Sequence, residues 1–347
     1  MAAPPTRPGG AAAPAAEGSG WVERIRQAGQ QRSFSGTLVT STGHVVSASK
    51  VARTGQGDRV VERVEALDGP QQRSLRSNDL IQTIWPQQKV VTVERRARAE
   101  DASGLPELDP RLQAHYELIE LGHERLARRE ATVLLLNPRD DLRFAQRLWA
   151  DQSTGLLLRA DVLTAQGQVL ESTAFSDIEI GSPSPRDTAG GPTAGAAPRA
   201  AVPARSTARA GSGHPAEPPL LEKPEGYRIV QLTSQPTTLE AEGWQLERPP
   251  AGFRLVGCVR RPVGEPGDEP AATALRAIQA VYTDGLARVS VFLEAADPAR
   301  PRQALVSQLG ATHTVVRPRD KWWVTLVGDV PLNTLKQFAD ALLPRRP

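Results

Sequence analysis

The chain has 347 residues, of which 39% are hydrophobic, and a formal net charge of +3. This length allows about two domains of ordinary size, each with a buried core. Arginine carries nearly all of the positive charge, since only five of the 42 basic residues are lysine. With abundant Ala, Gly and Pro, this indicates genome composition more than a nucleic-acid-binding surface, which needs clustered charge. The single cysteine, Cys258, excludes an internal disulfide and a cysteine-based zinc site.

Residues 1–20 are rich in Ala, Pro and Gly and predict a disordered tether. They lack the basic segment and the leucine-rich segment of a secretory signal, although such tethers often follow one. No run in the chain approaches the roughly 18 apolar residues of a membrane span.

Residues 21–181 consist mainly of short runs in which apolar residues alternate, bounded by turn signals such as the two Ser-Thr-Gly triplets at 41–43 and 153–155. They predict a meandering antiparallel sheet of roughly ten strands. Helices are expected over 20–31, with Trp21, Ile25 and Ala28 on one face, and as a short crossover within 105–116. A sheet this large with so few helices must curl, and its concave side is a natural ligand groove.

Residues 182–225 are crowded with Pro, Gly, Ala and Ser and predict a flexible linker, either a passive spacer or a segment that orders on a partner. Residues 226–347 predict a small α+β domain with a hairpin turn at Asp284-Gly285 and an amphipathic helix opened by Pro331. A further short helix is expected around "QALVSQLGA", residues 303–311. The predicted fold class is therefore α+β, with a large N-terminal sheet and a small C-terminal domain.

Motifs for catalysis are missing from the sequence. "HERLA" at 123–127 lacks the second histidine of a zinc protease, and "GQGDRV" at 55–60 lies between strands and lacks the third glycine of a dinucleotide fingerprint. No phosphate-binding loop and no Gly-x-Ser-x-Gly elbow occurs. Asp140-Asp141 beside Arg139 and Arg143 predicts a solvated charge cluster. The scattered histidines predict surface or turn positions: His44, His115, His123, His214 and His313. We therefore expect no enzyme activity, no cofactor and no metal.

Several segments in series resemble the MucB/RseB family, the periplasmic regulators of envelope-stress sigma factors. The resemblance runs in order from Trp21 to Leu343, interrupted only by the linker. The segments that carry it are "SFSGTLVTSTG", "EALDGPQQ", "WPQQKVVTVERR", "STGLLLRADVLTAQGQVLESTAFSDIEIG", "GWQLERPPAGFRLV", "VYTDGLARVSVFLE" and "VTLVGDVPLNTLKQFADAL". Several motifs in series are more specific than any one of them, since each alone is an ordinary hairpin.

The resemblance implies a large N-terminal half-barrel over 21–181, similar to the lipoprotein carriers (LolA-like), and a smaller C-terminal domain over 226–347. It also implies a periplasmic protein that binds the periplasmic part of a membrane-bound anti-sigma factor and shields it from site-one proteolysis. Lipopolysaccharide or mislocalised lipoprotein would release the shield. The alternative is a lipid or lipoprotein carrier that uses only the half-barrel groove, and a homo-oligomer stays open.

An amphiphile would place its acyl chains on the concave apolar face and its phosphates on Arg or Lys. Candidate groove residues, each of which could equally be plain core, are Leu38, Ile84, Trp85, Val91, Leu135, Phe144, Leu148 and Trp149. Trp85-Pro86 with Gln87-Gln88 predicts a hairpin turn at the rim of this groove.

A second candidate surface lies in "RPRDKWW", where basic side chains stand beside two tryptophans. This combination suits anionic headgroups or an acidic peptide. At least one of the two indoles should face the core, because neighbours on a strand point to opposite sides. The candidate residues are Arg317, Arg319, Lys321, Trp322 and Trp323.

Overall fold

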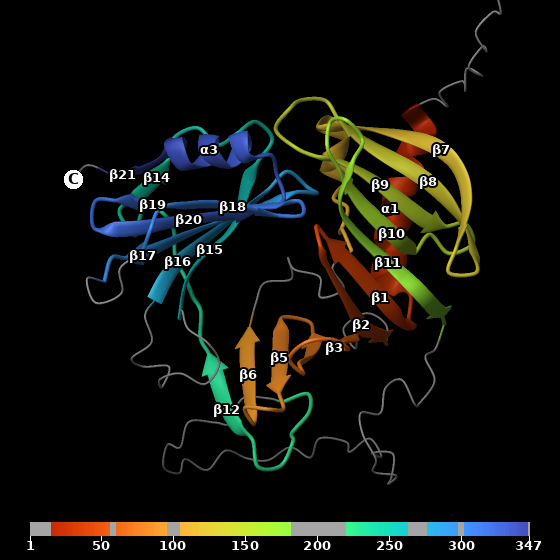
Figure 1. Cartoon of the computed structure of the whole chain (residues 1–347), viewed down its shortest axis with the longest axis horizontal. Coiled ribbons are helices and arrows are strands. Elements are labelled where there is room, and N and C mark those ends of the chain that lie inside the picture. Colours follow the sequence, from red (N-terminus) through yellow and green to blue (C-terminus); the bar gives the residue numbers. More distant parts are fainter. Residues whose placement is uncertain are drawn as a thin grey trace, which may run out of the picture.

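The computed structural model describes residues 15–55, 60–95, 105–181, 220–262, 276–297 and 302–345, with side chains from residue 20 onward. Within these residues the chain forms one large and one small β-sheet, each packed against its own α-helix (Figure 1). The two sheets meet side by side. The α+β class predicted from the sequence is confirmed.

The large sheet has twelve strands in the order β12-β6-β5-β4-β3-β2-β1-β11-β10-β9-β8-β7. Two antiparallel meanders, β1 to β6 and β7 to β11, join where β1 pairs with β11. The strands are β1 (Phe34–Thr42), β2 (Val45–Thr54), β3 (Val61–Ala66), β4 (Arg73–Ser77), β5 (Leu80–Trp85), β6 (Val90–Arg95), β7 (Tyr116–Leu126), β8 (Arg129–Pro138), β9 (Ala145–Asp151), β10 (Leu157–Leu163), β11 (Val169–Ile180) and β12 (Arg228–Leu232). The predicted meander is confirmed.

Helix α1 (Ala15–Gln31) fills the curl of this sheet. Its residues Val22, Ile25 and Ala28 recur at a spacing of three, so they share one face, and all three are buried. Val22 and Ile25 pack into a core with Leu134 and Leu148, whereas Ala28 packs into a second core on β1 and β11. The expected crossover at 105–116 is a short 3₁₀ helix, η2 (Pro110–Ala114), whose Leu112 joins the first of these cores.

The small sheet is antiparallel throughout and has the order β13-β15-β16-β17-β20-β19-β18. Helix α3 (Leu332–Ala341) covers one of its faces with Leu335 and Phe338, which are fully buried. A short pair, β14 (Trp244–Leu246) and β21 (Leu342–Pro344), lies beside the helix. The sheet strands are β13 (Gln235–Pro236), β15 (Arg254–Pro262), β16 (Arg276–Thr283), β17 (Arg288–Ala295), β18 (Leu305–Leu309), β19 (Thr312–Arg319) and β20 (Trp322–Gly328).

The short helix predicted around residues 303–311 is wrong. Residues Leu305–Leu309 form the edge strand β18, paired with β19 through a tight turn in which Gly310 takes a left-handed φ of 58°. All five strand residues are exposed. A short apolar run fits a helix or a strand equally well, and here the glycine turn and the hydrogen bonds to β19 decide between them.

One segment of the predicted C-terminal unit pairs with the large sheet. Most of the predicted linker, residues 182–219, lies outside the described residues, as do residues 1–14 of the expected tether. Arg228–Leu232, assigned from the sequence to the C-terminal unit, instead pairs in parallel with β6 of the large sheet. Tyr227 and Ile229 pack on the β4–β6 core, so burial of these residues holds the segment on the N-terminal sheet. The domain limits stay a prediction.

No helix in the described parts of the chain is both long and apolar enough to cross a bilayer.

Candidate functional site at the junction of the two sheets

A cavity of about 580 Å³ lies between the two sheets, within the range of about 300–1,000 Å³ that is typical of small-molecule sites. Its N-terminal wall comes from α1, from strands β1 to β4 and β10, and from the loop before η2. Its C-terminal wall comes from β15 and from the turn between β16 and β17. Apolar lining includes Ile25, Phe34, Leu105, Leu157, Val256 and Leu286.

Charged side chains surround this apolar lining, and cations outnumber anions. Five arginines and three carboxylates line the cavity. Arg53 pairs with Glu62, and Arg254 lies 2.9 Å from Asp109. Arg76 also lines the cavity, and its side chain has no hydrogen-bond or ion-pair partner among the residues that the structure describes. The cavity therefore combines an apolar interior with surplus positive charge, which suits an amphiphile with an anionic head.

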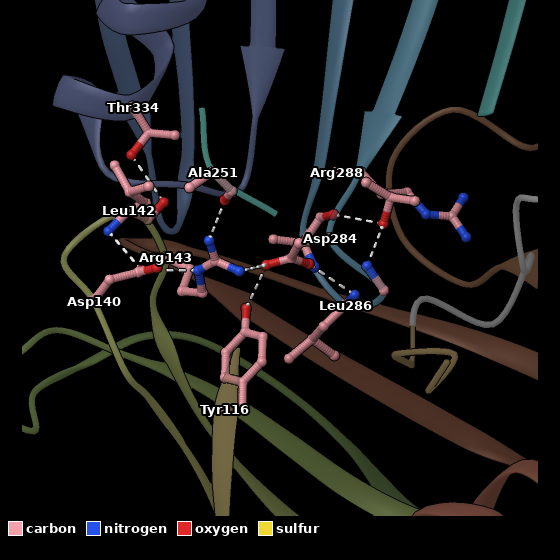
Figure 2. Close-up of polar contacts among 12 residues, drawn as sticks. Tyr116, Asp140, Leu142, Arg143, Ala251, Asp284, Leu286, Arg288 and Thr334 are labelled. Carbon is pink, nitrogen blue, oxygen red and sulfur yellow. Dashed lines mark hydrogen bonds and ion pairs between the residues drawn. The ribbon is translucent and has the colours of Figure 1, made fainter. Parts of the chain in front are cut away.

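Next to the cavity, the side chain of Arg143 joins the two domains (Figure 2). Arg143 follows β8 in the large sheet, and its Nη1 donates to Oδ2 of Asp284 in the small sheet at 3.0 Å. Its Nη2 donates to the carbonyl oxygen of Ala251, and its Nε donates to Asp140. Tyr116, at the start of β7, donates its hydroxyl to the same carboxylate oxygen at 3.0 Å. We call these five residues, Arg143, Asp140, Ala251, Asp284 and Tyr116, the Arg143 anchor.

Burial makes this anchor more sensitive to the loss of one partner than the more exposed ion pairs across the junction. The side chains of Arg143 and Asp284 are both 0% exposed, whereas Arg254 and Asp109 are 43% and 28% exposed. Exposed pairs contribute about 0–1 kcal/mol, but removing one partner of a buried pair costs about 3–5 kcal/mol. Removing either partner of the Arg143–Asp284 pair should therefore disturb the junction more than removing a partner of the exposed pair between Arg254 and Asp109.

The turn that carries Asp284 serves the anchor and the cavity together. In this junction turn, Asp284–Ala287, Oδ1 of Asp284 accepts the N–H groups of Leu286 and Ala287 and so fixes the turn. Gly285 and Leu286 line the cavity, and Leu286 packs into the core around α1. The carbonyl of Gly285 also accepts the N–H of Asp109 from the opposite domain. A movement of this turn would change both the Arg143 anchor and the cavity wall.

Three acidic side chains at the junction have raised pKa values. Burial, together with the nearby charges of Asp284 and Glu171, raises the pKa of Asp329 from 3.8 to about 6. Burial likewise raises the pKa of Glu171, whose carboxylate accepts the N–H of Ala311 across the junction. Burial and the adjacent charge of Asp284 raise the pKa of Tyr116, so its hydroxyl stays a proton donor.

Smaller contacts complete the junction. Phe144 of the large sheet stacks on His313 of the small one with 6.2 Å between ring centroids. Thr334 of α3 donates its hydroxyl to the carbonyl of Leu142 at 2.8 Å. Gly252 lies against the ring of His115, where a Cβ would come within 2.6 Å.

Most of these junction residues could not be identified from the sequence. Arg143 was expected in a solvated charge cluster, and this is wrong because its guanidinium is buried between the domains. His313 was expected at the surface or in a turn, but it is buried on β19, where its Nδ1 contacts the carbonyl of Val330 at 2.8 Å. Asp284-Gly285 forms the predicted hairpin turn, but the sequence did not indicate that Asp284 pairs with Arg143 across the junction. No group of three or more His, Cys, Asp or Glu within the described ranges is arranged to hold a metal.

The structure distributes the eight candidate groove residues over separate parts of the N-terminal domain, and none of them lines the cavity. Leu38 and Trp149 lie in the core on β1 and β11, Ile84 and Val91 in the core of β4 to β6, and Leu148 in the core around α1. Leu135, Phe144 and Trp85 are partly buried, and Trp85 ends β5 at the predicted turn. Their role in ligand binding stays a prediction.

The five candidate residues of the C-terminal cluster lie at or next to the turn between β19 and β20. Arg317 pairs with Asp340 of α3, and Arg319 donates to the carbonyls of Ala339 and Leu342 at the end of this helix. Trp322 packs on the domain core in edge contact with Trp244, which confirms that at least one indole faces inward. Lys321 is exposed and Trp323 is partly buried. Whether the cluster binds a partner stays a prediction.

Comparison with known families accounts for both halves of the chain. The profile of the MucB/RseB N-terminal domain matches residues 17–195, and that of the MucB/RseB C-terminal domain matches residues 238–343. The chain belongs to the MucB/RseB family. The resemblance found in the sequence is confirmed.

Curated family members match over nearly the whole chain. The sigma factor AlgU regulatory protein MucB of Pseudomonas aeruginosa is 31% identical, over 95% of this chain and 92% of that protein. The sigma-E factor regulatory protein RseB of Escherichia coli is 24% identical, over 92% of this chain and 88% of that protein. These relatives are named as regulators of sigma factors.

Solved structures of the family show the same fold. One of MucB in complex with MucA(peri) matches with a TM-score of 0.64 and 26% identity, over 95% of this chain and 100% of that chain. Another, of the Pseudomonas aeruginosa MucA/MucB complex, matches with a TM-score of 0.66 and 27% identity, over 95% of this chain and 100% of that chain.

Proposed function

We propose that this protein is a periplasmic regulatory binding protein. It binds the periplasmic part of a membrane-bound anti-sigma factor, shields that segment from site-one proteolysis and so restrains an envelope-stress sigma factor. The observation that carries the proposal is its likeness, over 95% of the chain, to MucB in complex with MucA(peri). This role requires only binding and no catalysis, so we propose that the protein is not an enzyme.

We further propose that lipopolysaccharide or another lipid-like ligand releases the shield. The apolar cavity with its five arginines supports this, because it offers space for an acyl chain and cations for a phosphate or carboxylate. A ligand shifts the complex only by as much as it prefers the free regulator. The cavity between the two sheets is a suitable place for such a preference, since its shape depends on how the domains dock.

The test is a pull-down with the periplasmic domain of the cognate anti-sigma factor, followed by timed proteolysis of that domain. Retention and slower cleavage at saturating regulator, reversed by lipopolysaccharide, are expected. Equal cleavage with and without the regulator would rule the proposal out.

A second function, that of a lipid or lipoprotein carrier, is favoured by the same cavity. It requires acyl chains to copurify with the protein, as mass spectrometry of an organic extract would detect. Copurified acyl chains together with no affinity for the anti-sigma domain would support the carrier and exclude the regulator.

A further inference from the structure

The chain connects the two sheets through a very short segment at one end of their junction. Strand β12 belongs to the large sheet and β13 to the small one, and only Thr233 and Ser234 lie between them. Ser234 donates to Glu94 of β6, and Arg261 of β15 lies 3.7 Å from the same carboxylate. The small sheet is thus held to the large one by a two-residue connection beside β6.

The Arg143 anchor joins the two sheets at a point distant from this two-residue connection. Figure 1 shows β12 and β6 at the lower end of the molecule and α3 at the upper end, and the loop that carries Arg143 reaches α3 through the Thr334–Leu142 hydrogen bond. The cavity receives wall residues from both sheets. Rotation about the connection therefore requires the anchor to break and changes the cavity wall.

We propose that Arg143 is the release point of a hinged junction, at which the small sheet rotates about Thr233–Ser234 when an amphiphile in the cavity displaces the junction turn. The amphiphile in this proposal rests on the proposed function. The hinge and its release point rest on the geometry alone.

The junction turn gives the coupling its physical basis. Asp284 holds Arg143 and Tyr116, and its neighbours Gly285 and Leu286 form the cavity wall. An occupant that shifts the backbone at Leu286, whose side chain packs into the core around α1, also pulls on Asp284, because Oδ1 of Asp284 accepts the N–H of Leu286 at 2.9 Å. The coupling is reciprocal, so breaking the anchor should in turn change the affinity for the amphiphile.

The chemistry of the anchor suits a contact that opens and closes. Arg143, Asp284, Tyr116 and the carbonyl of Ala251 are all rehydrated when the domains separate, and this recovers part of the desolvation that docking imposes. A purely apolar junction would expose its whole surface to water on opening. Two-state docking is the ordinary expectation for interdomain contacts of this polar kind.

The test measures the distance between the domains by pulsed electron spin resonance on the full chain. Nitroxide labels are placed at Leu121→Cys on β7 and Leu305→Cys on β18, since both side chains are 51% exposed. Cys258 stays unlabelled because it is buried, and burial raises its pKa to about 11. A second pair, Leu255→Cys with Leu305→Cys, lies within the small sheet and reports local distortion.

Wild type should give one main distance, and Arg143→Met should add a longer one with an open fraction at least about tenfold larger. Dansyl-undecanoic acid, a fluorescent anionic amphiphile, should raise the same longer population in wild type and bind Arg143→Met with changed affinity. Arg260→Met breaks an ion pair with Glu242 inside the small domain and should leave the interdomain distance unchanged.

The proposal is overturned if Arg143→Met and the amphiphile both leave the interdomain distance as in wild type. If Arg143→Met does not fold, Tyr116→Phe replaces it, since this variant removes one hydrogen bond to Asp284 and should open a smaller fraction. Timed proteolysis of the anti-sigma domain separates this outcome from the proposed function. Protection without any distance change rejects only the hinge, whereas a distance change without protection rejects only the regulatory role.

Discussion

Asp329 makes the stability of this protein depend on pH in a way that one substitution should remove. Its carboxylate accepts the N–H of Arg288 at 3.0 Å, but burial and the charges of Asp284 and Glu171 raise its pKa from 3.8 to about 6. The folded protein therefore binds a proton at Asp329 more tightly than the unfolded chain. The resulting stability is fully present below pH 3.8 and is lost as the pH rises through about 6.

The size of this effect follows from the shift in pKa. Each pKa unit corresponds to about 1.4 kcal/mol, so a rise from 3.8 to about 6 corresponds to about 3 kcal/mol at neutral pH. Asp329→Asn keeps an oxygen that accepts the N–H of Arg288 and carries no charge. At neutral pH the variant should be more stable than wild type by up to about 3 kcal/mol, and this gain should vanish near pH 4.

Urea unfolding followed by tryptophan fluorescence, measured at intervals from about pH 4 to about pH 7.5, gives the free energy of unfolding of both proteins. Asp151→Asn is the control with the opposite sign. Burial alone would raise the pKa of Asp151, but hydrogen bonds from Arg129, Ser153 and Thr154 together hold it well below its usual value. Asp151→Asn should therefore be less stable than wild type at neutral pH. A stability difference between Asp329→Asn and wild type that does not change with pH would show that titration of Asp329 does not cause the effect.

Three further substitutions test the junction and its surroundings. Gly285→Ala should lower the free energy of unfolding by about 1–3 kcal/mol, since Gly285 has a φ of 106° and an added Cβ would lie 3.2 Å from the Cβ of Asp109. The control Gly243→Ala, at a φ of 78° in open space, should lower the free energy of unfolding by less. Gln82→Leu should speed hydrogen exchange across residues 220–232, because this fully buried amide bonds the backbone of residues 221 and 222; unchanged exchange would contradict that role. Arg76→Gln should weaken dansyl-undecanoic acid binding about tenfold in a fluorescence titration, and an equal loss in Arg125→Gln, outside the cavity, would show nonspecific attraction.

Most secondary structure could be predicted from the sequence, because its signals are local. The spacing of Trp21, Ile25 and Ala28 predicts the face of α1 that the structure buries, and alternation predicts the meander of the large sheet. The run around Leu305 is too short for its apolar pattern to separate a strand from a helix. Asp284-Gly285 was predicted as a turn from two residues alone.

The junction could not be predicted, because it depends on contacts between distant parts of the chain. Tyr116 and Asp284 are 168 positions apart, and Arg143 and Asp284 are 141 apart. In the sequence alone, Arg143 with Asp140 and Asp141 resembles an exposed charge cluster. The opposite domain is what buries Arg143. The candidate groove residues lie in separate cores for a related reason. Alternation along a strand predicts that Leu38, Ile84 and Leu148 are buried, but it carries no information on which of the three cores each one joins.

The proposed regulatory role is tested by the rate at which a site-one protease cleaves the periplasmic domain of the cognate anti-sigma factor. This rate is measured with increasing amounts of the full chain, using gel densitometry of the uncleaved domain. Cleavage should slow as the protein is added, reach a plateau at saturation and recover when lipopolysaccharide is supplied. A cleavage rate that stays constant at a saturating concentration of the protein would exclude the proposed shielding.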